Sequence, residues 1–122
     1  MSEITIMRDI QVEATTAGHR LFRNNVGMGW TGKHIMFSRP MSVQVMPGDV
    51  LVRHARPLHA GLCEGSSDLI GFSNRGLFMA VEVKTPIGRL TDKQTDFIST
   101  VKSFGGISGC CRSISDFRLL NL

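Results

Sequence analysis

The first part of the chain carries apolar residues at helical spacing. These positions are Ile6, Ile10, Ala14, Ala17 and Leu21. Because they recur every three or four residues, they predict an amphipathic helix from about Ile6 to Phe22. The segment Asn24-Asn25-Val26-Gly27 is expected to end that helix.

The segment between Gly27 and Gly65 changes to short runs that are typical of strands. The predicted strands are His34–Phe37, Ser42–Met46 and Val50–Arg53. Pro47-Gly48-Asp49 is predicted to form the turn between the last two.

A hairpin is the clearest β-pattern in the chain. Asp68–Phe72 and Leu77–Lys84 read as two strands, and the turn-forming residues Ser73-Asn74-Arg75-Gly76 separate them. Consecutive strands with so short a connection are expected to pair antiparallel.

The last third of the chain predicts a helix, a strand and a short helix. Thr91 and Gln94 have the spacing of a capping box, and Gly105-Gly106 would end the helix that they begin. Its expected buried stripe is Phe97, Ile98, Val101 and Phe104. A strand over Ile107–Ile114 and a short helix capped by Ser115 follow. This order predicts an α/β fold in which helices flank a mixed β-sheet.

Size and composition fit one domain over residues 1–122. The chain has a formal net charge of +4, which favours a polyanionic partner, and it lacks tyrosine, which excludes a tyrosine nucleophile. Three cysteines without a C-x-x-C spacing indicate reduced thiols in the cytoplasm. No apolar run has the length of a membrane span, so no membrane partner is expected.

Glu82 and Lys84 lie two residues apart in a predicted strand, so they point to the same face. Such a pair also occurs at ordinary solvated strand ends. Asp68 begins the preceding strand of the hairpin, which places a second carboxylate near Glu82. Two carboxylates about 4 Å apart repel by about 4 kcal/mol at an effective dielectric constant near 20, so the pair requires a shared proton or a cation. A divalent cation and a lysine together suit a phosphate-handling site.

Two further polar residues have two interpretations each. Glu13 has the spacing of the apolar face of the first helix, where it would either join the site of Asp68 and Glu82 or form a salt bridge. Gln94 would either close the capping box with Thr91 or direct its amide toward a water or a phosphate.

The ordered motifs of the chain resemble a known family. These motifs are Gly65-Ser66-Ser67-Asp68-Leu69-Ile70-Gly71, Val81-Glu82-Val83-Lys84, and Gly88-Arg89-Leu90-Thr91 with Gln94. Together they are similar to the virus-type replication-repair nuclease (VRR-NUC) family of the PD-(D/E)xK nuclease superfamily. The resemblance extends from Glu13 to Gly105-Gly106.

The resemblance implies a restriction-endonuclease-like fold that cuts phosphodiester bonds with Mg²⁺ or Mn²⁺. It implies that Asp68, Glu82 and the carbonyl of Val83 bind the metal, and that Lys84 orients or deprotonates the attacking water. Glu13 would match the family's acid on the first helix, which contacts the metal directly or through water, and Gln94 would match its helix glutamine beside the site. Ser67 stands where the superfamily name expects proline, which leaves the rigidity of that turn open.

DNA is the expected partner, and no nucleotide cofactor is expected. Candidate phosphate contacts are Arg20, Arg23, Lys33, Arg39, Arg89 and Lys93, with Arg20 and Arg23 expected one turn apart on the first helix. The resemblance implies branched DNA such as four-way junctions, a homodimer, and a phage or mobile-element source.

Two alternatives to a junction endonuclease stay open at this point. One is a catalytically inactive DNA-binding module that recruits partners, and the other is a sequence-specific restriction endonuclease.

Overall fold

The computed structural model describes residues 2–25, 27–31 and 37–120. The elements in this part of the chain, in order, are α1 (Glu3–Thr16), β1 (Arg20–Arg23), β2 (Gly27–Thr31), β3 (Arg56–Ala60), β4 (Leu69–Phe72), β5 (Phe78–Val83), α2 (Asp92–Ser103), β6 (Ile107–Cys111) and α3 (Ile114–Arg118). The predicted strand at His34–Phe37 falls largely outside these residues, and Lys33 lies outside them altogether.

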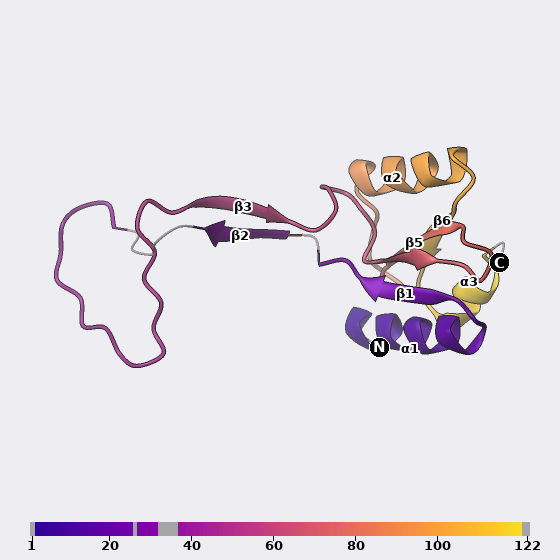
Figure 1. Cartoon of the computed structure of the whole chain (residues 1–122), viewed down its shortest axis with the longest axis horizontal. Coiled ribbons are helices and arrows are strands. Elements are labelled where there is room, and N and C mark those ends of the chain that lie inside the picture. The colour runs from indigo at the N-terminus through magenta and orange to yellow at the C-terminus, as the bar shows by residue number, and fades with distance from the viewer. Residues whose placement is uncertain (1, 26, 32–36, 121–122) are drawn as a thin grey trace.

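Four strands form the central sheet in the order β1-β4-β5-β6. β4 runs antiparallel to both β1 and β5, whereas β6 runs parallel to β5. Helices α1 and α2 cover opposite faces of this sheet, as Figure 1 shows. The predicted mixed β-sheet with flanking helices is therefore confirmed.

The apolar core lies between α1 and the sheet. Its buried residues are Ile6, Met7, Ile10, Ala14, Leu21, Leu69, Met79, Val81, Val83, Ile107, Cys111 and Phe117. Alternate residues of β5 contribute Met79, Val81 and Val83, so this strand presents its apolar face to α1. Glu82 then points to the face that α2 covers.

The first helix ends six residues before the predicted position, at Thr16 instead of Phe22. Gly18 follows with φ +89°, a conformation that turns the chain out of the helix, and residues 20–23 form β1. The apolar spacing predicted too long a helix because it included Leu21, which is buried but belongs to β1. Ala17, which the same spacing placed on the buried face, is exposed. Arg20 and Arg23 therefore lie at the two ends of β1, not one turn apart on a helix.

The segment between β1 and β4 differs most from the prediction. Residues 42–46 form no strand and Val52 makes only an isolated bridge, so the strands predicted at Ser42–Met46 and Val50–Arg53 are wrong. Instead β2 and β3 pair antiparallel in a two-stranded ribbon that extends away from the central sheet (Figure 1). Every residue of β3 is exposed, so no buried face imposes an alternating pattern on its sequence. The predicted turn at Pro47-Gly48-Asp49 is present, because the N–H of Asp49 donates to the carbonyl of Met46 over 2.9 Å.

The hairpin and the second helix follow the prediction closely. The N–H of Ser73 donates to the carbonyl of Leu77 across the turn between β4 and β5, and α2 begins after the N-cap Thr91 with its capping box formed. Of the predicted stripe, Ile98 and Val101 are buried and Phe97 is half-buried, whereas Phe104 follows α2 and is exposed.

The C-terminal boundaries are shifted from the predicted ones. β6 ends at Cys111, three residues before Ile114, and Ser113 caps α3 in place of Ser115. The hydroxyl of Ser113 accepts from the N–H of Asp116, so a neighbouring serine supplies the expected cap chemistry.

Candidate functional site

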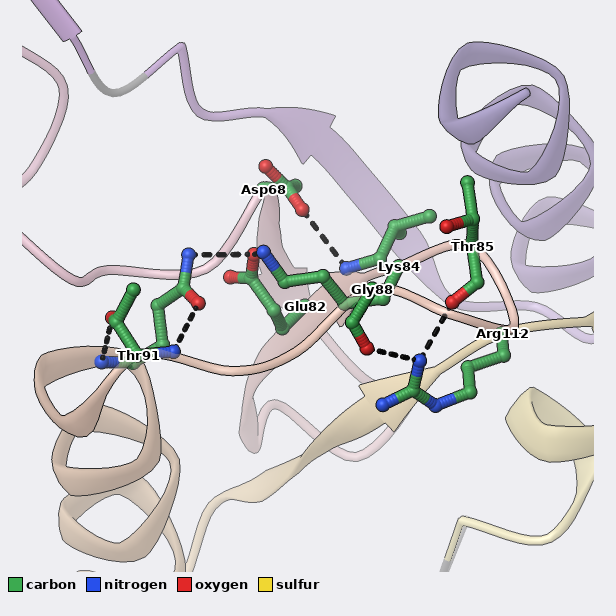
Figure 2. A network of polar contacts seen from close by, with 9 residues as sticks. Asp68, Glu82, Lys84, Thr85, Gly88, Thr91 and Arg112 are labelled. Atoms are coloured by element: carbon green, nitrogen blue, oxygen red, sulfur yellow. Dashed lines mark hydrogen bonds and ion pairs between the residues drawn. The ribbon is translucent and has the colours of Figure 1, made fainter.

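Asp68 and Glu82 come together where β4 begins and β5 ends. Because the two strands are antiparallel and Leu69 pairs with Val81, the residue before β4 lies beside the last residues of β5. Oδ2 of Asp68 accepts from the backbone N–H of Val83 over 2.9 Å, a contact drawn in Figure 2. The predicted meeting of the two carboxylates therefore has a direct topological cause.

The Glu82 carboxylate is buried, with 2% of the residue exposed. Its Oε1 accepts from Nε2 of Gln94 over 3.1 Å and lies 3.9 Å from Nζ of Lys84 (Figure 2). Its Oε2 is buried and has no hydrogen-bond partner among the described residues. A buried carboxylate oxygen without a partner is costly, so this atom requires compensation by a proton or a cation.

Burial and the neighbouring Asp68 carboxylate raise the pKa of Glu82 to about 8. Desolvation is the larger cause, since it disfavours the charged form, and repulsion from Asp68 acts in the same direction. Lys84 opposes both effects by lowering the pKa. The protein's own groups therefore compensate only part of the charge at this site.

Gln94 closes the predicted capping box and also contacts the carboxylate site. Its Oε1 accepts from the N–H of Thr91 over 2.9 Å and so closes the capping box, while its Nε2 donates to Glu82. Both contacts form at once because the side-chain amide has a separate donor and acceptor. The amide reaches a site carboxylate rather than the water or phosphate of the prediction.

Arg112, at the end of β6, holds the loop that connects Lys84 to α2. One guanidinium nitrogen donates to the carbonyls of Thr85 and Gly88, each over 2.6 Å (Figure 2). Sequence reasoning missed this residue, because a single arginine after a predicted strand carries no local signal for distant backbone carbonyls. Arg112 thereby fixes the path of the chain directly after Lys84.

The loop before Asp68 packs against the first turn of α2. Gly65 has φ +85°, and a Cβ placed on it would lie 2.7 Å from backbone atoms of Lys93. Glycine is required there for conformation and for space. An exposed ion pair between Glu64 and Lys93, with 2.8 Å between oxygen and nitrogen, spans the same contact.

Glu13 does not join Asp68 and Glu82 in the structure. It is ion-paired with Arg118 of α3, whose Nε lies 2.8 Å from Oε1, and this contact lowers the pKa of Glu13. Within the described part of the chain, no group of three or more His, Cys, Asp or Glu side chains is arranged to hold a metal ion. The salt bridge weighed as the alternative is the contact that the structure shows.

The basic candidates divide by their position relative to the carboxylates. Arg23 is exposed at the end of β1, paired with Leu69 and so next to Asp68, whereas Arg20 pairs with Phe72 at the other end of the strand. Arg89 is exposed in the loop between Lys84 and α2, and the exposed Lys93 is in the first turn of α2. Arg39 is exposed beyond the ribbon.

The residues present fit a divalent metal ion that prefers oxygen ligands. Two carboxylates converge, Oε2 of Glu82 is buried without a hydrogen-bond partner among the described residues, and Lys84 lies 3.9 Å from the other oxygen, Oε1. Mg²⁺ and Mn²⁺ are commonly held by one or two carboxylates, with waters and substrate oxygens as the other ligands. Two side-chain ligands are therefore sufficient for such an ion.

Comparison with known proteins gives one family. The profile of the VRR-NUC domain matches residues 22–115, a range that contains Asp68, Glu82, Lys84 and Gln94. A search of the curated proteins finds no match to the chain. None of the helices in the described ranges has the length and apolar character needed to cross a membrane.

Proposed function

Because the chain belongs to the VRR-NUC domain family, which implies a nuclease that acts on DNA, we propose that it is a metal-dependent endodeoxyribonuclease. The observation that carries the metal dependence is the buried Glu82 carboxylate, with its unpartnered Oε2, beside the partly exposed Asp68. In this proposal both side chains and the carbonyl of Val83 hold one Mg²⁺ or Mn²⁺ ion.

The bound ion would supply Lewis-acid activation of a phosphate oxygen and would lower the pKa of a coordinated water. The chain's own residues place the remaining groups. Gln94 orients Glu82 through Oε1 and leaves Oε2 for the ion, and the cap of α2 fixes Gln94 in turn. Lys84 presents an ammonium 3.9 Å from Glu82, where it can orient the attacking water and stabilise charge on the phosphate.

The DNA contacts that we propose surround the carboxylates. Arg23, Arg89 and Lys93 are exposed on three segments that meet at this end of the sheet. Arginine and lysine at such positions contact backbone phosphates without reading sequence. Arg20 and Arg39 extend the basic surface to the far end of β1 and beyond the ribbon.

We propose branched DNA, such as a four-way junction, as the preferred substrate, and a homodimer as the working form. The support is the likeness of stand-alone VRR-NUC proteins to junction resolvases. Paired cuts on two strands require two active sites, which a symmetric dimer supplies.

A cleavage panel tests the function. Labelled four-way junction and linear duplex of the same sequence are incubated with Mg²⁺, Mn²⁺ or EDTA, and Asp68→Asn serves as the inactive control. We expect metal-dependent cutting of the junction that Asp68→Asn abolishes. Binding without cutting would support an inactive DNA-binding module, and discrete cuts in linear duplex would support a restriction enzyme. Light scattering of the purified protein tests the dimer.

A further inference from the structure

Asn24 uses its whole side-chain amide to join three segments beside the carboxylate site. It follows β1 directly and is nearly buried. Its Nδ2 donates to the hydroxyl of Ser66 over 2.8 Å and to the carbonyl of Ser67 over 2.9 Å. Its Oδ1 accepts from the N–H of Leu62 over 3.0 Å.

The backbone of Asn24 adds a fourth contact, to Asp68 itself. The N–H of Asn24 donates to the carbonyl of Asp68 over 2.7 Å. Asn24 therefore joins the end of β1 to Leu62, where the chain returns from β3, and to the three residues that precede β4. The Ser66 hydroxyl in turn donates to the carbonyl of Cys63 over 2.6 Å, which closes the turn before Asp68.

These contacts bear on the residue that precedes the metal-binding aspartate. Position 67 is a serine, so the chain there lacks the fixed φ that a proline ring imposes. The Ser67 hydroxyl has no hydrogen-bond partner among the described residues and thus gives the turn no support. The bond from Asn24 to the Ser67 carbonyl is the side-chain contact that restrains this peptide.

We propose that Asn24 is a positioning residue for Asp68: it replaces the missing proline by fixing the Ser67 peptide through a hydrogen bond. The inference rests on the proposed function, in that Asp68 must bind the metal for its position to matter. Residues that orient metal ligands through hydrogen bonds typically affect metal affinity or activity 10- to 100-fold.

Mn²⁺ binding without DNA measures this role directly. Calorimetry compares wild type, Asn24→Ala and Asn24→Asp, with Asn25→Ala as the matched control, since Asn25 is the exposed neighbour. We expect Asn24→Ala to raise the Kd for Mn²⁺ about tenfold. The Kd of Asn25→Ala should equal that of wild type. The metal concentration for half-maximal cleavage should rise by the same factor, while DNA binding in EDTA stays within about twofold.

Asn24→Asp distinguishes a role in positioning Asp68 from a role in holding the Leu62 segment in place. It keeps an acceptor for the Leu62 N–H but loses the donor to Ser67. Positioning predicts weakened Mn²⁺ binding, although an added negative charge would by itself strengthen binding of a cation. If Asn24→Asp does not fold, Ser66→Ala, which keeps the bond from Nδ2 to the Ser67 carbonyl but removes the hydroxyl's contacts with Nδ2 and Cys63, should show a smaller weakening in the same direction.

The inference is overturned if folded Asn24→Ala binds Mn²⁺ with the wild-type Kd, or if only its folded fraction falls. That result leaves the nuclease proposal standing when wild type cuts DNA. Wild-type protein that neither binds Mn²⁺ nor cuts DNA would instead overturn the proposed function.

Discussion

Replacing Glu82 by glutamine should stabilise the metal-free protein at high pH while it removes metal binding. The carboxylate is buried, lies near Asp68, and leaves Oε2 without a partner. A neutral amide of the same shape still offers an oxygen to Gln94 and carries no charge that needs compensation. The same group therefore costs stability and provides function.

The magnitude follows from the pKa of Glu82, which is raised from 4.5 to about 8. Between these values the folded protein retains a proton that the unfolded chain has released. Folding stability consequently falls as the pH rises from about 4.5 to about 8, and it levels off above that. Each pH unit in the window corresponds to about 1.4 kcal/mol, so the total is on the order of a few kcal/mol.

The assay is urea unfolding with EDTA at pH 5 and at pH 9. At pH 9 we expect Glu82→Gln to be more stable than wild type by about 2–4 kcal/mol. At pH 5, where wild-type Glu82 is protonated, the two proteins should agree within about 1 kcal/mol. Asp96→Asn, which changes an exposed carboxylate of α2, is the control and should show no such pH-dependent gain.

Metal supplies the second half of the same experiment. Adding Mn²⁺ at pH 8 should stabilise wild type and leave Glu82→Gln unchanged, because an ion that binds only the folded state shifts unfolding by mass action. A glutamine variant that is less stable at pH 9, or whose difference from wild type is the same at both pH values, would refute the electrostatic reasoning.

Three further predictions concern the same site and its surroundings. Lys84→Ala should retain Mn²⁺ binding by calorimetry while DNA cutting falls at least about a hundredfold; near wild-type cutting would remove Lys84 from the mechanism. Metal binding at pH 7 should release close to one proton per site, because the pKa of Glu82 is raised to about 8, and calorimetry in buffers of different ionisation enthalpy measures it. Glu13→Gln and Arg118→Ala should each keep cleavage within about threefold of wild type, because these residues pair with one another and not with the carboxylate site. A loss of several orders of magnitude in Glu13→Gln alone would return Glu13 to the metal site.

Local sequence patterns predicted those parts of the fold that depend on local chemistry. The β4–β5 hairpin and the Thr91–Gln94 capping box are each specified by a few adjacent residues, and both are present. The predicted end of α1 is wrong because Leu21 is buried in the same core but lies in β1. Its position continues the helical spacing of apolar residues, although the backbone leaves the helix before Gly18. All five residues of β3 are exposed, so this strand has no buried face that could mark it in the sequence.

The carboxylate site was predictable because strand alternation and hairpin pairing place Asp68 beside Glu82. Spacing alone could not distinguish a site acid from a salt-bridged one at Glu13, since its partner Arg118 lies far along the chain. Asn24 and Arg112 escaped prediction for the same reason. Their partners are mostly backbone groups, which the tertiary structure brings near from distant parts of the chain.

The chain leaves the central sheet for the β2–β3 ribbon and returns from it at the same place, because Asn24 contacts both Leu62 and Asp68. The described residues between these two points form an insertion into the α/β core, and none of them belongs to a strand of the central sheet. A change in the length or sequence of this insertion is therefore expected to leave the strand order of the central sheet intact. Replacing the ribbon at this point of the chain would give variants that share the carboxylate site and differ in the surface that the ribbon presents.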